Sequence, residues 1–152
     1  MKALRETIAA FGVLFSIATV AMHYAELPNR IPTHFNAHGV VNGWGDKSSL
    51  WTLVGVACGV YLVMTLFRFL PAKAISLPVP AERRVAAMPI AFAMVGWMKA
   101  EMAWIFAADT WFLVAVAQGH CKGLIPWFTP VVLVTLSGTV AYYFWQMTRI
   151  EG

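Results

Sequence analysis

The segment Glu26–Lys47, ELPNRIPTHFNAHGVVNGWGDK, is the only long polar stretch in a chain otherwise made of apolar runs. Pro28 and Pro32 fix φ and hold the residues before them in extended conformations, so this segment cannot continue a helix. Gly39 and Gly43 then supply the freedom for turns that bring the chain back. The sequence therefore predicts a structured polar loop over residues 26–47 that joins two apolar helices.

The composition indicates a membrane protein. Of 152 residues, 60% are hydrophobic and only 12% are charged, whereas about a quarter of the residues in a soluble domain are charged. The net charge of +4 includes no basic block and no interleaving of basic and aromatic residues, so nucleic acid is not an expected partner. Cys58 and Cys121 have no metal-ligand spacing, and we expect no disulfide between them. The first expected partner is the lipid bilayer.

Four apolar runs surround the polar loop, at about residues 4–25, 50–70, 90–117 and 124–147. Each is long enough to cross about 30 Å of hydrocarbon as a helix. Lys2 and Arg5 precede the first run as in a signal peptide, but we expect this run to be retained as a helix. Because a chain in lipid must satisfy its backbone groups internally, we predict an all-α integral membrane four-helix bundle with a structured polar loop, in one domain over residues 1–152.

The sequence also predicts where the second span begins and leaves two interpretations of the third. Ser48 and Ser49 are good N-cap residues for the second span. The third apolar stretch, from Val85 to Ala117, is too long for one upright span. It is either one tilted or kinked helix with Pro89 near its start, or a short interfacial piece followed by a helix.

The distribution of basic residues predicts the orientation in the membrane. Four spans place both termini on the same side, which holds seven Lys and Arg residues against three on the other side. The seven are Lys2, Arg5, Arg68, Lys73, Arg83, Arg84 and Arg149, and the three are Arg30, Lys47 and Lys122. By the positive-inside rule, the termini are cytoplasmic and the loop 26–47 is outside.

The string LPNRIPTHFN at Leu27–Asn36, followed by Gly39 and by NGWGDK at Asn42–Lys47, resembles the domain of unknown function 1648. That domain also forms the N-terminal part of SdpI-type bacteriocin immunity proteins. The resemblance covers about a third of the chain and implies a protein of the bacterial cytoplasmic (inner) membrane whose motif faces outward. The family usually has an acidic residue where Asn42 stands. The motif residues expected to bind a partner are Pro28, Arg30, Pro32, His34, Phe35, Asn36, Gly39, Trp44, Gly45 and Lys47.

The histidines allow two interpretations. His34 and His38 are four residues apart, and all four histidines, with His23 and His120, could lie on one side of the membrane. A zinc, copper or haem site is then conceivable. In the other interpretation, His34 and Asn36 satisfy backbone groups that the two prolines free, and they hold the loop onto the helix ends.

Lys99 and Glu101 lie in the middle of the third apolar stretch, where an ionisable group costs about 3 kcal/mol or more. They are two residues apart, hence about 200° apart around a helix, and cannot face the same partner. In a functional interpretation, Glu101 pairs with Arg68 or lines a water-filled path with Asp109. In a structural one, both charges lie near the cytoplasmic interface and their side chains reach toward it.

Aromatic and small residues indicate how the spans meet lipid and each other. Tryptophans and tyrosines fall near the predicted membrane boundaries, as interfacial anchors do: Trp44, Trp51, Trp111 and Trp127 at the outer boundary, and Tyr142, Tyr143 and Trp145 at the inner one. Gly55, Ala57 and Gly59 offer a close-packing face on the second span, for its own bundle or for a neighbouring protein.

Together these features favour a non-enzymatic protein that works by binding a partner and requires no cofactor. The partner is a larger membrane complex, for which this chain is an accessory subunit, a second copy of the chain, or a toxin in the manner of SdpI-like immunity or signalling proteins. The alternative is a metal- or haem-binding redox or transport element centred on His34. The sequence has no nucleophile elbow and no H-E-x-x-H motif that would indicate a hydrolase.

Overall fold

The computed structural model describes residues 1–36, 38–71 and 74–150. Lys73, which contributes to the predicted charge bias, lies outside the described residues. The main elements in chain order are α1 (Lys2–His23), β1 (Arg30–Phe35), β2 (Val41–Asp46), α2 (Ser49–Leu66), α3 (Arg84–Ala117) and α4 (Phe128–Thr148). All four α-helices are long and apolar enough to cross a membrane. The prediction of an all-α, multi-pass membrane protein is therefore confirmed.

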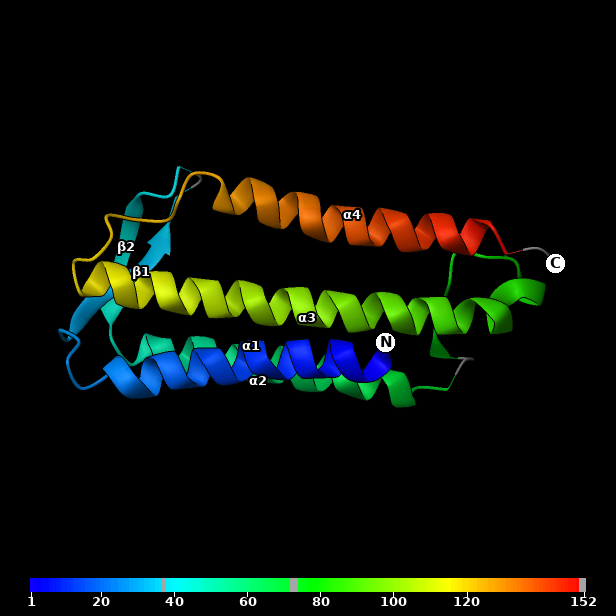
Figure 1. The fold of residues 1–152 in the computed structure, drawn as a ribbon, viewed down its shortest axis with the longest axis horizontal. Coiled ribbons are helices and arrows are strands. Elements are labelled where there is room, and N and C mark those ends of the chain that lie inside the picture. The colour runs from blue at the N-terminus through cyan, green and yellow to red at the C-terminus, as the bar shows by residue number, and fades with distance from the viewer. Residues whose placement is uncertain (37, 72–73, 151–152) are drawn as a thin grey trace.

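The third apolar stretch is one continuous helix, α3, of 34 residues with Pro89 inside its second turn. At 1.5 Å per residue it is about 51 Å long, so it extends beyond the start of α1 (Figure 1). We call the end of the molecule that holds the two termini the terminal end, and the end that holds β1 and β2 the hairpin end.

The fourth helix begins at Phe128, four residues later than predicted. Pro130 lies in its first turn, where the missing N–H costs no helical hydrogen bond. The backbone N–H of Leu124, which the prediction placed inside the helix, instead donates to the carbonyl of Gly39 at 2.9 Å. Leu124 therefore contacts the hairpin end instead of forming the first turn of α4.

Helices α1 and α2 lie on one face of α3, and α4 lies on the other (Figure 1). We call the face with α1 and α2 the closed side and the face with α4 the open side. On the closed side α1 and α3 approach closely through small residues: a Cβ added to Gly12 would lie 2.9 Å from the carbonyl carbon of Ala103. Ala9 and Ala100 are buried in the same contact. Small residues let two membrane helices come this close.

The small residues of α2 have a different position from those of α1. A Cβ added to Gly55 or Gly59 would meet no atom of the described chain within 4 Å, although Ala57 on the opposite face is buried. The interpretation in which Gly55 and Gly59 pack inside their own bundle is therefore wrong, because both face outward.

On the open side, α4 packs mainly against α3. Met147, near its end, is the one buried residue of α4 in the described chain, and it contacts Ala87 and Ala91. The bundle is therefore a close-packed group of three helices with a fourth attached along one edge.

Candidate functional site

The predicted extended segment is one strand of a β-hairpin. β1 pairs antiparallel with β2, with Arg30 opposite Asp46 and irregular register on both sides of His34. A Cβ added to Gly43 would lie 2.9 Å from the Cβ of His34, and one added to Gly45 would lie 2.8 Å from the Cγ2 of Thr33. The glycines are therefore needed for the strands to approach. The extended conformation was predicted, but the pairing with residues 41–46 was not.

Lys47 and Ile31 fix the base of the hairpin to the helix ends. The Lys47 ammonium donates to the carbonyls of Tyr24 at 3.3 Å and Leu27 at 3.1 Å, and it lies 4.9 Å from the centre of the Tyr24 ring. A positive charge just beyond the C-terminus of α1 is favoured by the helix dipole. Ile31 is fully buried in a core that includes Leu50 of α2. The hairpin thus covers the ends of α1 and α2.

The tip of the hairpin binds the loop that precedes α4. The Asn36 side-chain oxygen accepts hydrogen bonds from the backbone N–H groups of His38 and Val40, which shapes a turn that ends at Gly39 with φ +77°. Val40 then forms a β-bridge with Gly123, beside the hydrogen bond between Leu124 and Gly39. The two loops at the hairpin end are therefore held together by backbone contacts.

His34 does not have the predicted structural role, whereas the Asn36 side chain does bind backbone groups. The four histidines also do not meet. The His34 Nδ1–H donates to the side-chain oxygen of Asn42 at 2.5 Å, and among the described residues the His34 ring forms no hydrogen bond with a backbone group. His23 donates through Nδ1 to the carbonyl of Thr19 at 2.9 Å. In the parts of the chain that the structure describes, no group of three or more His, Cys, Asp or Glu side chains could hold a metal ion. The structure thus does not bring His23, His34, His38 and His120 together, and both cysteines are free.

Asp46 connects the hairpin to α2. Its carboxylate accepts a hydrogen bond from the backbone N–H of Ser48 at 2.8 Å, and its carbonyl accepts one from the Ser49 hydroxyl at 2.7 Å. The predicted capping by a serine side chain is wrong, since Ser48 occupies the N-cap position but its hydroxyl makes no cap bond. The Ser48 N–H holds the pKa of Asp46 below its ordinary value because it stabilises the carboxylate.

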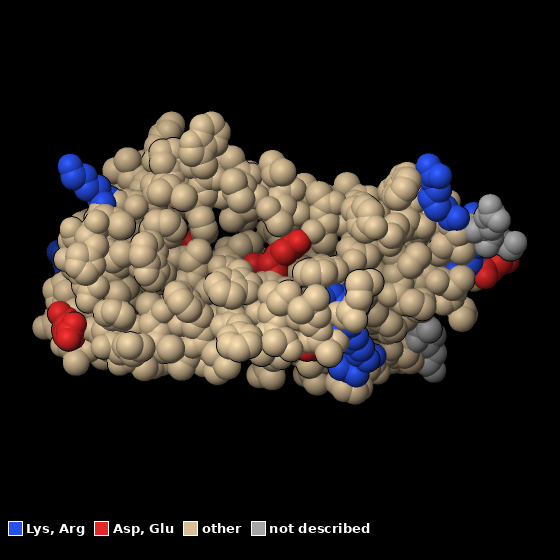
Figure 2. Space-filling model, viewed as in Figure 1, with Lys and Arg blue, Asp and Glu red and all other residues tan. Residues whose placement is uncertain are grey.

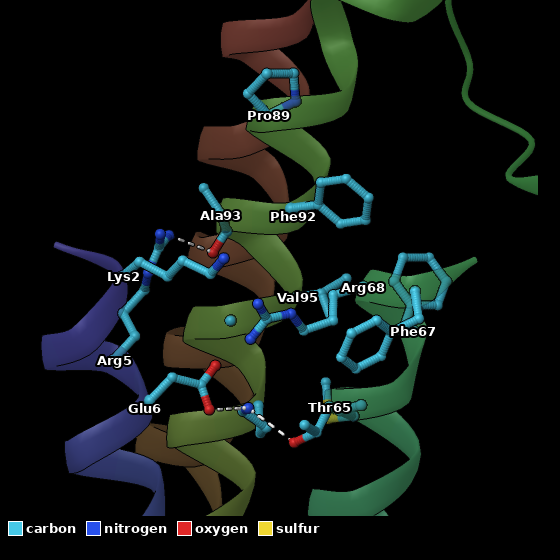
Figure 3. Close-up of a pocket in the computed structure, with 14 residues that line it drawn as sticks. Lys2, Arg5, Glu6, Thr65, Phe67, Arg68, Pro89, Phe92, Ala93 and Val95 are labelled. Atoms are coloured by element: carbon cyan, nitrogen blue, oxygen red, sulfur yellow. Dashed lines mark hydrogen bonds and ion pairs between the residues drawn. The ribbon is translucent and has the colours of Figure 1, made fainter. Parts of the chain in front are cut away.

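A cavity of about 500 Å³ lies at the terminal end, between the start of α1, the end of α2 and the first half of α3 (Figure 3). Lys2, Arg5, Arg68 and Lys99 bring basic groups to its wall. We call it the basic cavity.

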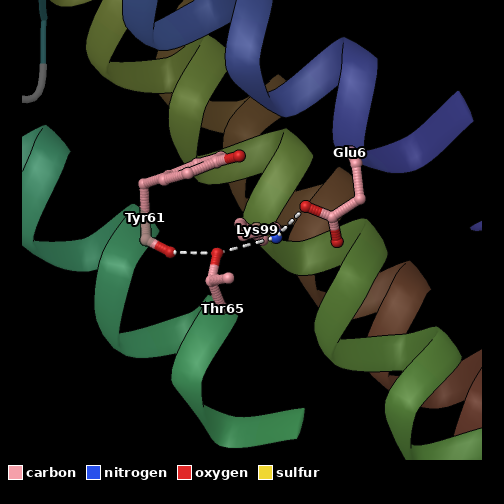
Figure 4. Close-up of polar contacts among 4 residues, drawn as sticks. All are labelled: Glu6, Tyr61, Thr65 and Lys99. Carbon is pink, nitrogen blue, oxygen red and sulfur yellow. Dashed lines mark hydrogen bonds and ion pairs between the residues drawn. The ribbon is translucent and has the colours of Figure 1, made fainter. Parts of the chain in front are cut away.

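Lys99 lines the basic cavity with a buried side chain. Its side chain is 2% exposed, and its ammonium lies 2.6 Å from a carboxylate oxygen of Glu6. It also donates to the Thr65 hydroxyl at 3.0 Å and lies 4.7 Å from the centre of the Tyr61 ring (Figure 4). Groups from the start of α1 and the end of α2 therefore hold the Lys99 ammonium inside the closed side.

Glu101 faces the opposite direction, into a cleft of about 380 Å³ between α3 and α4. One oxygen accepts a hydrogen bond from the Thr139 hydroxyl of α4, and the other is buried without a hydrogen-bond partner among the described residues. Figure 2 shows acidic atoms in a hollow near the middle of a face on which most of the visible atoms belong to uncharged residues. We call this hollow the α3–α4 cleft.

The walls of the α3–α4 cleft are largely apolar and aromatic. They are formed by Ile8, Trp97, Ala100, Glu101, Trp104, Ile105, Phe128, Val131, Val132 and Thr135. Arg68, the predicted partner of Glu101, lines the basic cavity instead, and Asp109 does not line the cleft. Both predicted partners are therefore wrong, and Thr139 is the partner that the sequence did not reveal.

Comparison with known families identifies the segment that carries the hairpin. Residues 11–58 match the family model described as Domain of unknown function (DUF1648). The DUF1648 match confirms the predicted resemblance and spans most of α1, the hairpin and the first part of α2. No curated protein and no solved structure matches the chain.

Some motif residues of the DUF1648 segment are buried and others are exposed. Pro32 and Gly39 are buried, and Phe35 packs against the core. Pro28, Arg30, His34 and Trp44 are exposed, Trp44 to 55%. The basic cavity and the α3–α4 cleft, by contrast, are built mostly from residues outside the DUF1648 segment. The motif therefore secures the hairpin end, and the two cavities belong to the rest of the chain.

Proposed function

We propose that this protein is a non-enzymatic accessory subunit of a membrane complex, which binds a transmembrane helix of another subunit in the α3–α4 cleft. The observation that carries the proposal is the buried oxygen of Glu101, which lacks a donor among the described residues. In hydrocarbon a polar group without a partner is costly. A partner side chain that donates to Glu101 would remove that cost and make the contact specific.

The shape of the cleft supports a helix as the occupant. α4 packs mainly against α3, and the space beside them is lined by aromatic and branched side chains such as Trp104, Phe128 and Val131. A helix with an apolar face and one hydroxyl, amide or basic group fits this combination. The chemistry required is one hydrogen-bond donor on an otherwise apolar surface.

The charge of Glu101 favours a different chain over a second copy. In a two-fold symmetric dimer formed through this cleft, the same patch would meet itself. If Glu101 lay close to the two-fold axis, the two carboxylates would face one another and each would still lack a donor. A subunit of different sequence can supply the donor directly.

The proposal also includes the orientation, with cytoplasmic termini, and the location in the bacterial inner membrane. The excess of Lys and Arg at the terminal end supports cytoplasmic termini and an outer hairpin. The DUF1648 match supports the bacterial inner membrane through the family resemblance.

A second candidate is favoured by the hairpin itself. Trp44 and Arg30 are exposed on the DUF1648 segment, at the end proposed to face outward. Exposed aromatic and arginine side chains are frequent anchors of protein interfaces. In this version the partner is an extracytoplasmic toxin, as for the immunity proteins, and it contacts the hairpin rather than the cleft.

Photo-crosslinking in native membranes separates the two candidates. A photoreactive residue is placed at Val131 in the cleft, at Trp44 on the hairpin, or at Val63 on the outward face of α2 as a control. The accessory-subunit proposal expects a discrete adduct with another membrane protein from Val131, which is lost in the Glu101→Leu variant, and none from Val63. An adduct from Trp44 alone supports the toxin candidate, and an adduct with a second copy from Val131 contradicts the hetero-subunit proposal.

A further inference from the structure

The basic cavity carries an excess of positive charge that the chain does not balance. Glu6 is the one acidic residue among its described lining residues, and its carboxylate is already bound to Lys99. Lys2, Arg5 and Arg68 bring three more positive charges, and no carboxylate in the described chain forms an ion pair with any of them. The cavity is therefore arranged to accept an anion.

We propose that the basic cavity binds the phosphate-bearing headgroup of an anionic phospholipid. Its cations come from the start of α1 and from the residues just after α2, where the chain leaves the apolar spans. Headgroup phosphates lie at this depth, just outside the hydrocarbon. Basic pockets between membrane helices on the cytoplasmic side are known to bind such headgroups, and the charge bias predicts that the terminal end is cytoplasmic.

Two arginines are held in place to receive the phosphate. Arg5 donates one hydrogen bond from its guanidinium to the carbonyl of Ala93 at 2.9 Å, which fixes the group at the cavity wall (Figure 3). Arg68 lies with its guanidinium carbon 5.1 Å from the centre of the Phe69 ring. The remaining N–H groups of both side chains are available for bidentate binding to phosphate oxygens. Side chains that are already ordered lose less entropy on binding.

The apolar part of the wall favours a lipid over a free phosphate ion. Phe67 and Phe92 line the cavity and pack edge to face, with ring centres 6.4 Å apart. Phe69 also lines it and is 70% exposed toward the surroundings. These rings offer contacts for the glycerol and the upper acyl chains, which inorganic phosphate lacks.

The test uses the full chain purified in a mild detergent. Native mass spectrometry measures the binding of phosphatidylglycerol, of phosphatidylcholine with the same acyl chains, and of inorganic phosphate. The variants are Arg68→Gln, Arg68→Lys and Arg149→Gln. Arg149 is an exposed arginine at the same end of the molecule that does not line the cavity, so its variant controls for general surface charge.

The proposal expects phosphatidylglycerol to bind in preference to phosphatidylcholine. Arg68→Gln should weaken phosphatidylglycerol binding about tenfold, because one charge-assisted contact is lost. Arg68→Lys should weaken binding less than Arg68→Gln, because lysine keeps the charge but loses the bidentate contact, and Arg149→Gln should match the unaltered chain. Equal binding of both lipids, or an equal loss in Arg68→Gln and Arg149→Gln, would overturn the site. If inorganic phosphate binds as tightly as phosphatidylglycerol and displaces it, the site takes a free anion and the lipid assignment is wrong.

Discussion

The two sides of α3 differ in how many partners they offer a buried ionisable side chain, although Lys99 and Glu101 are only two residues apart. On the closed side, Lys99 is surrounded by Glu6, Thr65 and the Tyr61 ring. On the open side, Glu101 has Thr139 as its one hydrogen-bond partner and a second oxygen without any in the described chain. A buried ionisable group that the chain satisfies itself stabilises the fold, whereas one that it satisfies only halfway supports the proposal that another molecule binds there.

The largest expected effect comes from removing the charge on the closed side. Lys99→Met leaves the Glu6 carboxylate without its partner among three packed helices. Breaking a fully buried ion pair on one side costs about 3–5 kcal/mol. Because the Glu6 side chain is 33% exposed, we expect a smaller loss than this, seen as unfolding in detergent at a lower temperature. Circular dichroism during heating measures the difference.

The double variant Glu6→Gln with Lys99→Met is the control for that prediction. It removes both charges and should recover most of the stability lost in Lys99→Met. If Lys99→Met alone unfolds at the same temperature as the unaltered chain, the ion pair does not hold the closed side together.

The next prediction compares a glycine of α1 that packs against α3 with a glycine of α2 that faces outward. Gly12→Ala adds a Cβ 2.9 Å from the backbone of Ala103, so α1 and α3 must separate. The overpacking should lower the free energy of unfolding by about 1–2 kcal/mol, after the gain in helix propensity is subtracted. Gly55→Ala, which meets no described atom, is the matched control and should be neutral or slightly stabilising. Equal destabilisation by both would show that contact with α3 is not the cause.

Removing the charge on the open side should have a small effect on stability. Glu101→Leu replaces a half-satisfied carboxylate with an apolar group, and such replacements are often neutral or stabilising. The Thr139 hydroxyl can turn to a backbone carbonyl of its own helix. We expect the free energy of unfolding to stay within about 1 kcal/mol of the unaltered chain, by denaturation in detergent. A loss as large as that of Lys99→Met would remove the distinction between the two sides.

The smallest effect concerns pH at the hairpin end, away from both buried charges. Because the folded pKa of Asp46 is lowered, its stabilising contribution is complete above the unfolded pKa. It is lost as the pH falls through the lower, folded pKa. Asp46→Asn should therefore flatten the acid part of the stability profile between these two values. An unchanged profile would show that the Ser48 contact does not contribute.

Much of the fold could be predicted from the sequence because its signals are local. Four apolar runs of spanning length predicted four helices, and Pro28 and Pro32 predicted an extended segment in the polar loop. The pairing of that segment with residues 41–46 was missed because Pro32, Gly43 and Gly45 interrupt the usual strand pattern. The same glycines are required by the close approach of the strands.

The site could be predicted only in part because its contacts join distant positions. Lys99 and Glu101 stood out as charges inside an apolar run, and their opposite directions followed from helix geometry. Their partners did not follow, because Glu6 is 93 residues from Lys99 and Thr139 is 38 residues from Glu101. No local pattern distinguishes these partners from other polar residues near the spans.

The backbone contacts between the hairpin tip and the loop before α4 bear on how such chains diversify. The hydrogen bond from Leu124 to Gly39 and the bridge between Val40 and Gly123 use main-chain atoms. They require glycine on both sides, because a Cβ added to Gly39 or to Gly123 would clash with the backbone of the other loop. The segment that follows α3 therefore needs glycine at position 123, whereas the side chains of its later residues are not restricted by this contact. The arrangement favours modularity, in which one glycine-dependent anchor precedes a membrane helix whose own sequence the anchor does not dictate.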